Sequence, residues 1–446
     1  MNLIYGVKDK PTFGKTLVFA FQQVLAILAA TIAVPSIIGN GMSQSAALFG
    51  AGIGTLVYLL FTKFKSPVFL GSSFAFIGSM FAAFGGAASA AAGHAGIIIG
   101  AAFAGLVYVI LAIIVKFAGV KWIAKLMPPV VIGPTVAIIG LSLAGNAVGD
   151  VLKFAQFDGA NGVYVMGTQG WIGLLCALVT IAVVILCSTY GKKTIKLIPF
   201  IMGILAGYAL ASIFTVIGMA TGNAALQVIT FPTINGIFSV PDFTFVKALS
   251  GFAQITPDYI ATLAVAYVPV AFVVFAEHIA DHKNLSSIIG SELLEEPGLH
   301  RTLLGDGIGS VAGAIFGGCP NTTYGESVGC VAISGNASVV TILTTAILAL
   351  VAAFFTPFVA FLASIPACVM GGVCITLYGF IAVSGLKMLQ QVDLGENKNL
   401  FVVAVILITG IGGMALQIGQ IKITAIACAL ILGILVNLMV SGKKAQ

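Results

Sequence analysis

The chain has 446 residues, of which 59% are hydrophobic and only 8% are charged. About 25% of the residues of a soluble domain are charged, so this composition excludes a soluble globular protein. It indicates a polytopic membrane protein instead. The net charge of +6 does not indicate nucleic-acid binding, because Lys and Arg are scattered among the connections between apolar segments.

A membrane-spanning helix needs about 20 mostly apolar residues, and fourteen segments are candidates for such spans. The third and the tenth are short and interrupted by Pro and Gly. The long connection 219–258 is predicted to be an ordered extramembrane loop or hairpin. The predicted spans are 16–38, 44–62, 68–86, 95–117, 126–146, 169–189, 197–218, 259–282, 301–318, 321–335, 337–363, 366–387, 398–418 and 420–441.

The distribution of Lys and Arg predicts the orientation of these spans. If the N-terminus is cytoplasmic, 17 of the 20 basic residues fall in cytoplasmic connections, and the exceptions are Lys153, Lys247 and Lys422. This asymmetry follows the positive-inside rule. We therefore predict a multi-pass protein of the cell membrane with both termini in the cytoplasm.

Three pairs of motifs recur along the chain at an offset of seven spans. Because seven is odd, the two copies have opposite orientations in the membrane, as in the inverted repeats of secondary transporters. The sequence thus predicts an all-α fold of 14 transmembrane segments in a 7+7 inverted repeat. The pairs are Gly50–Thr55 with Gly305–Ser310, Pro67–Phe74 with Pro320–Glu326, and Pro128–Gly133 with Pro366–Gly371.

The broken third and tenth spans occupy corresponding places in the two repeats. Pro and small residues allow each chain to run extended before a half-helix begins. The N-termini of two half-helices would then meet near the middle of the membrane, with free N–H groups and positive dipole ends. We therefore expect the substrate site between these two breaks.

Four acidic residues lie within or at the edge of predicted spans: Glu277, Asp281, Asp306 and Glu326. A carboxyl group at this depth is costly and is a functional candidate by default. Glu277 and Asp281 are four residues apart, so both should face one side of a helix. Two adjacent carboxyls in a low dielectric resist double ionisation, which suits proton coupling.

Alternative roles remain open for two of these acids and for three neighbouring polar residues. Asp281 lies beside two basic side chains. It is therefore more compatible than Glu277 with a structural ion pair or with a helix end in the headgroup zone. Glu326 opens the tenth half-helix, where it would complement the dipole. His278 points away from Glu277 and is predicted to make a structural hydrogen bond. Gln22 or Gln23 in the first span would face the cavity.

The residues at the two breaks suit a flat ligand with N–H donors beside carbonyl acceptors, which is the pattern of a nucleobase. The Glu326 carboxylate can accept from two adjacent N–H groups, and the main-chain N–H of Gly325 or Phe74 can donate to a carbonyl. Phe74 and Tyr324 can stack on a flat ring. The alternative for Phe74 is simple packing.

No enzyme motif is present, because the sequence lacks H-E-x-x-H, a Walker A loop and G-x-S-x-G. We therefore expect neither catalysis nor a cofactor or metal. Without a nucleotide-binding domain, an ion gradient is the expected energy source. A channel is disfavoured, since a single site between two interrupted spans suits occlusion of a ligand better than a continuous pore.

Several stretches resemble the nucleobase–ascorbate transporter family, and especially its bacterial uracil–proton symporters. They are Leu70–Phe76, Ala276–His278, Pro297–Arg301, Pro320–Glu326 and Met370–Val373. The resemblance implies a homodimer with elevator-like movement and short antiparallel strands in spans 3 and 10. It implies a core domain (1–119 and 259–363) and a gate domain (120–218 and 364–446), with 219–258 as the extracellular or periplasmic connection.

By matching position, the resemblance implies that Glu277 and Glu326 hold the base. Phe74 would line the site or stack on the base, and Tyr324 and Gly325 would shape the pocket. Ser327 stands where other members carry Asn, and we include it among the substrate-binding candidates.

The resemblance leaves the substrate divided between pyrimidines and purines. Span 10 favours uracil. Asp281, where uracil symporters carry His, and Asp306 lean toward xanthine, guanine or urate. We predict import of uracil with a proton, with Glu277, Asp281 and Asp306 as proton-coupling candidates and Na⁺ as the alternative ion.

Two rival classes are weighed against this prediction. A 7+7 anion transporter of the sulfate or bicarbonate type is disfavoured by the two Glu residues at the predicted site. A receptor or scaffold that does not transport should lack paired acids at the breaks.

Overall fold

The computed structural model describes residues 3–119, 128–192, 194–232, 234, 236–418 and 421–441. The chain is predominantly helical, and eight of the described helices are long and apolar enough to cross a membrane. It is therefore a multi-pass membrane protein. Residue 126, predicted to begin the fifth span, and the predicted cytoplasmic residues 442–446 lie outside the described residues.

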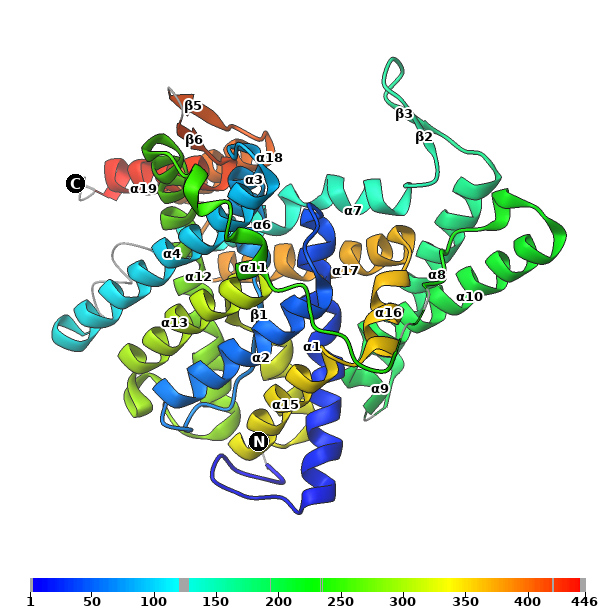
Figure 1. Cartoon of the computed structure of the whole chain (residues 1–446). Coiled ribbons are helices and arrows are strands. Elements are labelled where there is room, and N and C mark those ends of the chain that lie inside the picture. Colours follow the sequence, from blue (N-terminus) through cyan, green and yellow to red (C-terminus); the bar gives the residue numbers. More distant parts are fainter. Residues whose placement is uncertain are drawn as a thin grey trace.

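The elements follow the predicted spans closely, with their order shown in Figure 1. The helices are α1 (Phe13–Ile38), α2 (Gln44–Phe61), η1 (Phe74–Phe76), α3 (Ile77–Gly85), α4 (Ala90–Ala118), α6 (Pro129–Ser142), α7 (Ala144–Val151), α8 (Thr168–Tyr190), α9 (Thr194–Leu197), α10 (Pro199–Thr221), η2 (Ala224–Leu226), α11 (Thr244–Ala248), η3 (Phe252–Gln254), α12 (Pro257–Ile289), η4 (Leu294–Gly298), α13 (Leu299–Gly317), α14 (Gly325–Ser334), α15 (Val339–Ala352), α16 (Thr356–Ser364), α17 (Ala367–Leu389), α18 (Asn397–Ile411) and α19 (Ala425–Ser441). The strands are β1 (Leu70–Ser72), β2 (Gln156–Asp158), β3 (Val163–Val165), β4 (Asn321–Thr323), β5 (Leu416–Ile418) and β6 (Ile421–Ile423).

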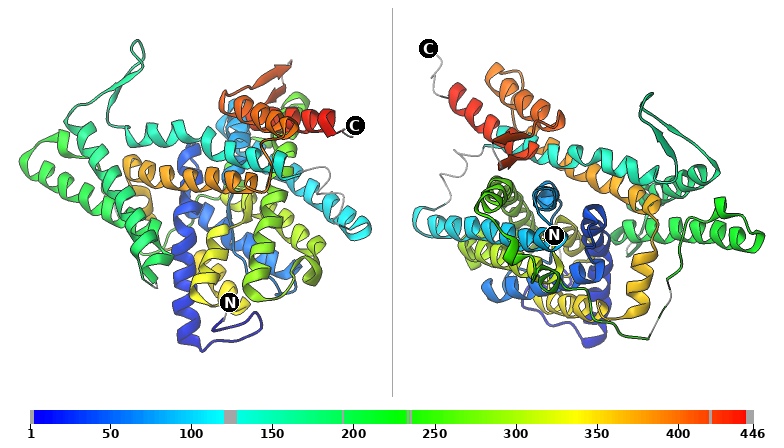
Figure 2. Two further views of the ribbon diagram at one scale, coloured as in Figure 1. Left: turned by 180° about the vertical axis from the view of Figure 1, so that it is seen from behind. Right: turned by 45° about the horizontal axis from the view of Figure 1, so that its top comes forward.

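Two groups of helices lie on either side of α1. Helices α2, α4, α12 and α13 contact one another in one group, and α8, α10 and α17 contact one another in the other. Figures 1 and 2 show α4, α12 and α13 on one side of α1 and α8 and α10 on the other. This arrangement leaves the short elements of the third and tenth segments near the centre.

The motifs that recur in the sequence meet each other in space. Strand β1 pairs antiparallel with β4 in the register Leu70↔Thr323, Gly71↔Thr322 and Ser72↔Asn321. Helices α2 and α13 cross where Gly54 faces Gly309, because a Cβ on either glycine would lie within 3 Å of the other's carbonyl oxygen. Glycine thus permits the two repeat-related helices to pack backbone to backbone.

Gly54→Ala is expected to destabilise the protein by about 1–3 kcal/mol, as overpacking of a tight core does. The added Cβ would lie 2.5 Å from Asn321 Nδ2 and 2.9 Å from Gly309 O. Gly149→Ala on α7 is the matched control, since its Cβ meets nothing within 4 Å. Thermal unfolding in detergent measures both. Equal melting temperatures for the two variants would contradict the packing argument.

Residues 337–363, predicted as one span, form two helices. Helix α15 ends at Ala352 and α16 begins at Thr356 with Pro357 in its first turn, a position that favours helix starts. The long connection forms hydrogen bonds with the backbone groups that the break leaves unpaired. The Thr356 N–H donates to Ile237 O (2.8 Å), and the Ser239 N–H donates to Phe354 O (2.9 Å).

The connection 219–258 is ordered in its described part, as predicted. It contains η2, α11 and η3 rather than a hairpin within the described residues. Helix α11 contacts α4 and α13. An antiparallel strand pair occurs later, where β5 pairs with β6 after the end of α18 at Ile411. Residues 416–418, at the end of the predicted thirteenth span, are therefore strand and not helix.

Candidate functional site

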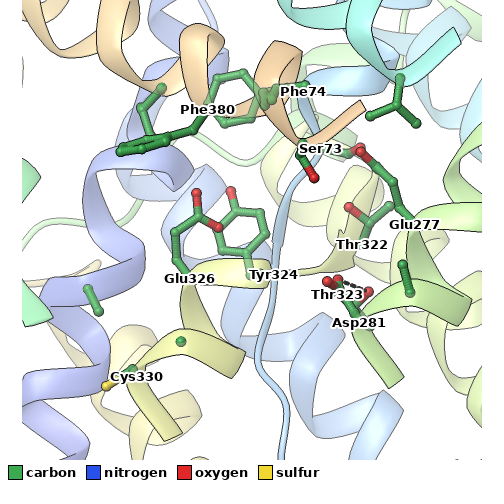
Figure 3. Close-up of a pocket in the computed structure, with 18 of the residues that line it drawn as sticks. Ser73, Phe74, Glu277, Asp281, Thr322, Thr323, Tyr324, Glu326, Cys330 and Phe380 are labelled. Atoms are coloured by element: carbon green, nitrogen blue, oxygen red, sulfur yellow. Dashed lines mark hydrogen bonds between the residues drawn. The ribbon is translucent and has the colours of Figure 1, made fainter. Parts of the chain in front are cut away.

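A cavity of about 530 Å³ lies where the two broken segments meet α12 and α17. Its volume falls within the range of about 300–1,000 Å³ typical of small-molecule sites. Figure 3 shows its polar and aromatic lining. The residues that the argument uses are Phe74, Ser188, Lys196, Glu277, Asp281, Thr322, Thr323, Tyr324, Gly325, Glu326 and Phe380.

Two helix N-termini are positioned at this cavity by the β1–β4 pair. Helix η1 begins at Phe74 directly after β1, and α14 begins at Gly325 directly after β4. The first N–H groups of a helix have no partner within the helix, and the helix end carries partial positive charge. The strand pairing therefore holds hydrogen-bond donors of both repeats at one site.

Three carboxyl groups line the cavity. Glu277 and Asp281 lie one turn apart on α12, so the prediction that both face one side is confirmed. Thr323 Oγ1 donates to Asp281 Oδ2 at 2.9 Å. Glu326 approaches from α14 (Figure 3). No hydrogen bond joins Glu277 or Glu326 to another residue of the described ranges, so both carboxyls are free to accept from a ligand.

The aromatic rings are set by specific contacts. Tyr324 Oη donates to the Ser72 carbonyl oxygen at 2.7 Å. The Tyr324 ring lies over Gly71, where a Cβ would come within 2.3 Å of it. Phe74 meets Tyr378 of α17 edge to face, with ring centroids 5.8 Å apart. Both predicted aromatic residues therefore line the cavity in fixed orientations.

Ser327 is not brought to the cavity, although it was predicted among the binding residues. Its side chain is fully buried and points toward α1 and the strand that precedes η1. Ser327 Oγ accepts from Gln23 Nε2 and from the main-chain N–H of Phe69, the latter at 3.0 Å. Gln23 likewise holds α14 in place and does not line the cavity.

Asp306 is also outside this cavity. His278 Nδ1 lies 2.7 Å from Asp306 Oδ2, and His278 Nε2 lies 2.9 Å from Thr302 Oγ1. The prediction of a structural hydrogen bond for His278 is confirmed. Asp306 is held from α12 and faces a second, much smaller cavity.

Phe380 and Lys196 are among the lining residues that the sequence did not indicate. Phe380 on α17 is more than half exposed and points into the cavity opposite Glu326 (Figure 3). The spacing of Phe380, Ser384 and Met388 at intervals of four residues could have indicated this lining, because residues with that spacing share one helix face. All three line the cavity. Lys196, counted only as a topological marker, lines it from α9.

A family model described as the Permease family matches residues 14–419. The chain belongs to this family. It is 39% identical to a uracil permease of Bacillus caldolyticus over 443 residues, covering 99% of this chain and 95% of the relative. It is 36% identical to a uracil permease of Bacillus subtilis (strain 168), covering 99% of this chain and 96% of the relative. The family and these relatives are permeases, so the prediction of a transporter rather than an enzyme is confirmed.

The permease also shares its fold with a solved structure of low sequence identity. The transmembrane domain of the cyanobacterium bicarbonate transporter BicA superposes with a TM-score of 0.63 at 16% identity, covering 97% of this chain and 99% of that chain. An identity this low carries the fold alone. The architecture is therefore the fold of that transmembrane domain.

Phe380→Ala in this permease is expected to raise KM for the transported ligand about 5- to 10-fold, because an aromatic contact is worth about 0.5–1.5 kcal/mol beyond its buried area. Vmax should change less, since Phe380 belongs to α17 and the three carboxyls of the site belong to α12 and α14. Phe401→Ala is the matched control, because Phe401 is exposed on α18 away from the cavity. Concentration-dependent uptake measures both variants, and an unchanged KM for Phe380→Ala would remove this ring from the site.

Proposed function

We propose that this permease imports a nucleobase, with uracil first, by secondary transport coupled to a proton. The observation that carries the proposal is the pair Glu277 and Glu326. Both carboxyls face one cavity and have no hydrogen bond to another described residue, and Phe74 and Phe380 stand beside them. A flat, neutral ring with adjacent N–H and carbonyl groups complements this combination.

The proposed binding mode uses both repeats. The Glu326 and Glu277 carboxylates accept the N–H groups of the base, and the first main-chain N–H groups of η1 and α14 donate to its carbonyl oxygens. Phe74 packs against its face, while Tyr324 and Gly325 shape the wall. Ser327 acts indirectly, by fixing α14 to α1 through Gln23.

The proposed cycle is an elevator in which a core domain (1–119 and 259–363) moves against a gate domain (120–218 and 364–446) within 14 spans and a homodimer. The two contact groups of helices on either side of α1 support this division. Ser188, Lys196 and Pro199 line the cavity and lie at the connection predicted to be cytoplasmic. We therefore assign this conformation to the inward-facing state, in which base and proton are released.

Glu277 and Asp281 are the proposed proton carriers. They share one face of α12 at the cavity, where neutralisation of one carboxyl relieves the repulsion between the two. Asp306 contributes through His278, which follows Glu277 directly in α12. Coupling of base and proton then follows from their shared cavity.

A purine permease of the same family is the second candidate, favoured by Asp281. Thr323 holds the Asp281 carboxyl at the cavity wall. This carboxyl supplies a hydrogen-bond acceptor that a larger base could reach. An anion transporter shares the fold, but three carboxyls line this cavity against one cationic side chain, that of Lys196.

Uptake by purified protein in liposomes tests the assignment. Radiolabelled uracil, xanthine, guanine, urate and sulfate are compared at one concentration, with protein-free liposomes as the control. We expect uracil to accumulate. Accumulation of xanthine without uracil would select the purine alternative, and accumulation of sulfate alone would overturn the proposal.

A further inference from the structure

Behind the substrate cavity lies a second cavity of about 10 Å³, enclosed by α4, α13 and β4. Tyr108, Asp306, Ser310 and Asn321 are among the residues that line it. Each of these side chains is at most 5% exposed. None of the four atoms (Tyr108 Oη, Asp306 Oδ1, Ser310 Oγ and Asn321 Oδ1) has a hydrogen-bond partner among the described residues. A buried polar atom without a partner costs about 1–3 kcal/mol, so four at one point indicate a ligand.

The orientation of these groups is set by their other contacts. Asn321 Nδ2 donates to the Gly50 carbonyl oxygen at 2.8 Å, which directs the amide oxygen to the cavity. Asp306 Oδ2 is engaged by His278, which leaves Oδ1 facing inward. Ser310 lies one turn after Asp306 on α13, so both share a helix face.

We propose that this cavity is a binding site for a single water molecule. About 10–15 Å³ accommodates one water, which usually makes two to four hydrogen bonds. The water donates its two hydrogens to Asp306 Oδ1 and Asn321 Oδ1, which only accept. It accepts from the hydroxyls of Tyr108 and Ser310, so that all four groups are satisfied.

A cation fits these groups less well than water. A sodium ion would take lone pairs from the Tyr108 and Ser310 hydroxyls and leave both of their hydrogens without an acceptor. Neither hydroxyl has another partner in the described part of the chain. These hydroxyl, amide and carboxylate groups therefore favour a molecule that both donates and accepts hydrogen bonds.

The bound water positions the wall of the substrate cavity. Thr322 lines both cavities and separates them. The water joins Tyr108 of the first repeat to Asp306 and Ser310 of the second. Through Asn321 it also anchors β4, whose next two residues face the substrate site. Tyr108 and Ser310 are thus positioning residues that touch no substrate.

The sign of a stability change tests the water site independently of what the permease carries. With water bound, Tyr108→Phe and Ser310→Ala each remove one of its hydrogen bonds, and each should lower Tm by about 2 °C or more. In a dry cavity the same changes delete an unpaired buried hydroxyl and should raise Tm. Tyr190→Phe is the matched control, since Tyr190 is 76% exposed, and its Tm should not change.

Three further measurements complete the test. Replacing NaCl by choline chloride at constant ionic strength should leave Tm unchanged, and a saturable rise with Na⁺ would overturn the proposal in favour of a cation. An experimental map that shows ordered water should contain one peak among the four oxygens, and no peak there would overturn it. In uptake assays Tyr108→Phe should raise KM more than it lowers Vmax, and an unchanged KM would overturn the positioning role.

Discussion

Glu326→Gln is expected to reduce uracil uptake about 100-fold or more while leaving a folded protein. Hydrogen bonds to a charged group contribute about 1.5–3 kcal/mol each, and each 1.4 kcal/mol corresponds to about a tenfold change in affinity. Gln keeps the shape of the side chain but presents an NH₂ group to the N–H donors of the base. One favourable contact therefore becomes repulsive, and the other weakens because the amide oxygen accepts without a charge.

Folding should survive this change, because no hydrogen bond joins the Glu326 side chain to another residue in the described part of the chain. Size-exclusion chromatography and thermal unfolding in detergent check the fold, and uptake into liposomes checks the activity. Glu295→Gln is the matched control, since Glu295 is exposed between α12 and α13 and lies outside the cavity. Retained uptake by Glu326→Gln would remove this carboxyl from the site.

Glu277→Gln is expected to abolish accumulation driven by a pH gradient while preserving exchange. An amide of the same shape cannot take up a proton, so net movement of base with a proton is lost. Exchange of internal for external base requires no net proton transfer. It should continue at saturating substrate, with affinity reduced about tenfold by the loss of one charged acceptor.

The experiment compares two assays on the same liposomes. Uptake is measured with the outside more acidic than the inside, and counterflow is measured with equal pH on both sides. Asp281→Asn serves as the paired variant, because it changes the other carboxyl on the same face of α12. If Glu277→Gln still accumulates uracil in response to the gradient while Asp281→Asn does not, Asp281 carries the proton. Failure of the wild-type protein to respond to the gradient would refute proton coupling itself.

Much of the candidate site could be predicted because its residues break local rules. Pro320 and the carboxyl of Glu326 are costly within an apolar segment, and Glu277 and Asp281 are four residues apart on a helix. Such features stand out in a sequence that is 8% charged. Phe74 was harder to identify, since it is one of 31 Phe residues and only its place beside the break marked it.

The placements that the sequence did not indicate arose where the rotation of a helix decides the contacts. Ser327 follows Glu326 by one residue, so it points about 100° away around α14, toward Gln23 rather than into the cavity. Asp306 has the intramembrane position of a coupling residue, but α13 turns it toward His278 and the second cavity. Phe380 has no unusual chemistry, and only the placement of α17 against the broken segments marks it.

The sequence by itself determined the class, the approximate spans, the charge asymmetry and the acidic residues of this permease, because hydropathy and charge act locally along a chain in a membrane. It also indicated that the breaks at Pro67 and Pro320 correspond. Only the tertiary structure decided that β1 and β4 pair in one register, and that Asn321 reaches Gly50 across 271 positions of sequence. Contacts of this kind depend on backbone-to-backbone packing at Gly54 and Gly309, which no local pattern specifies.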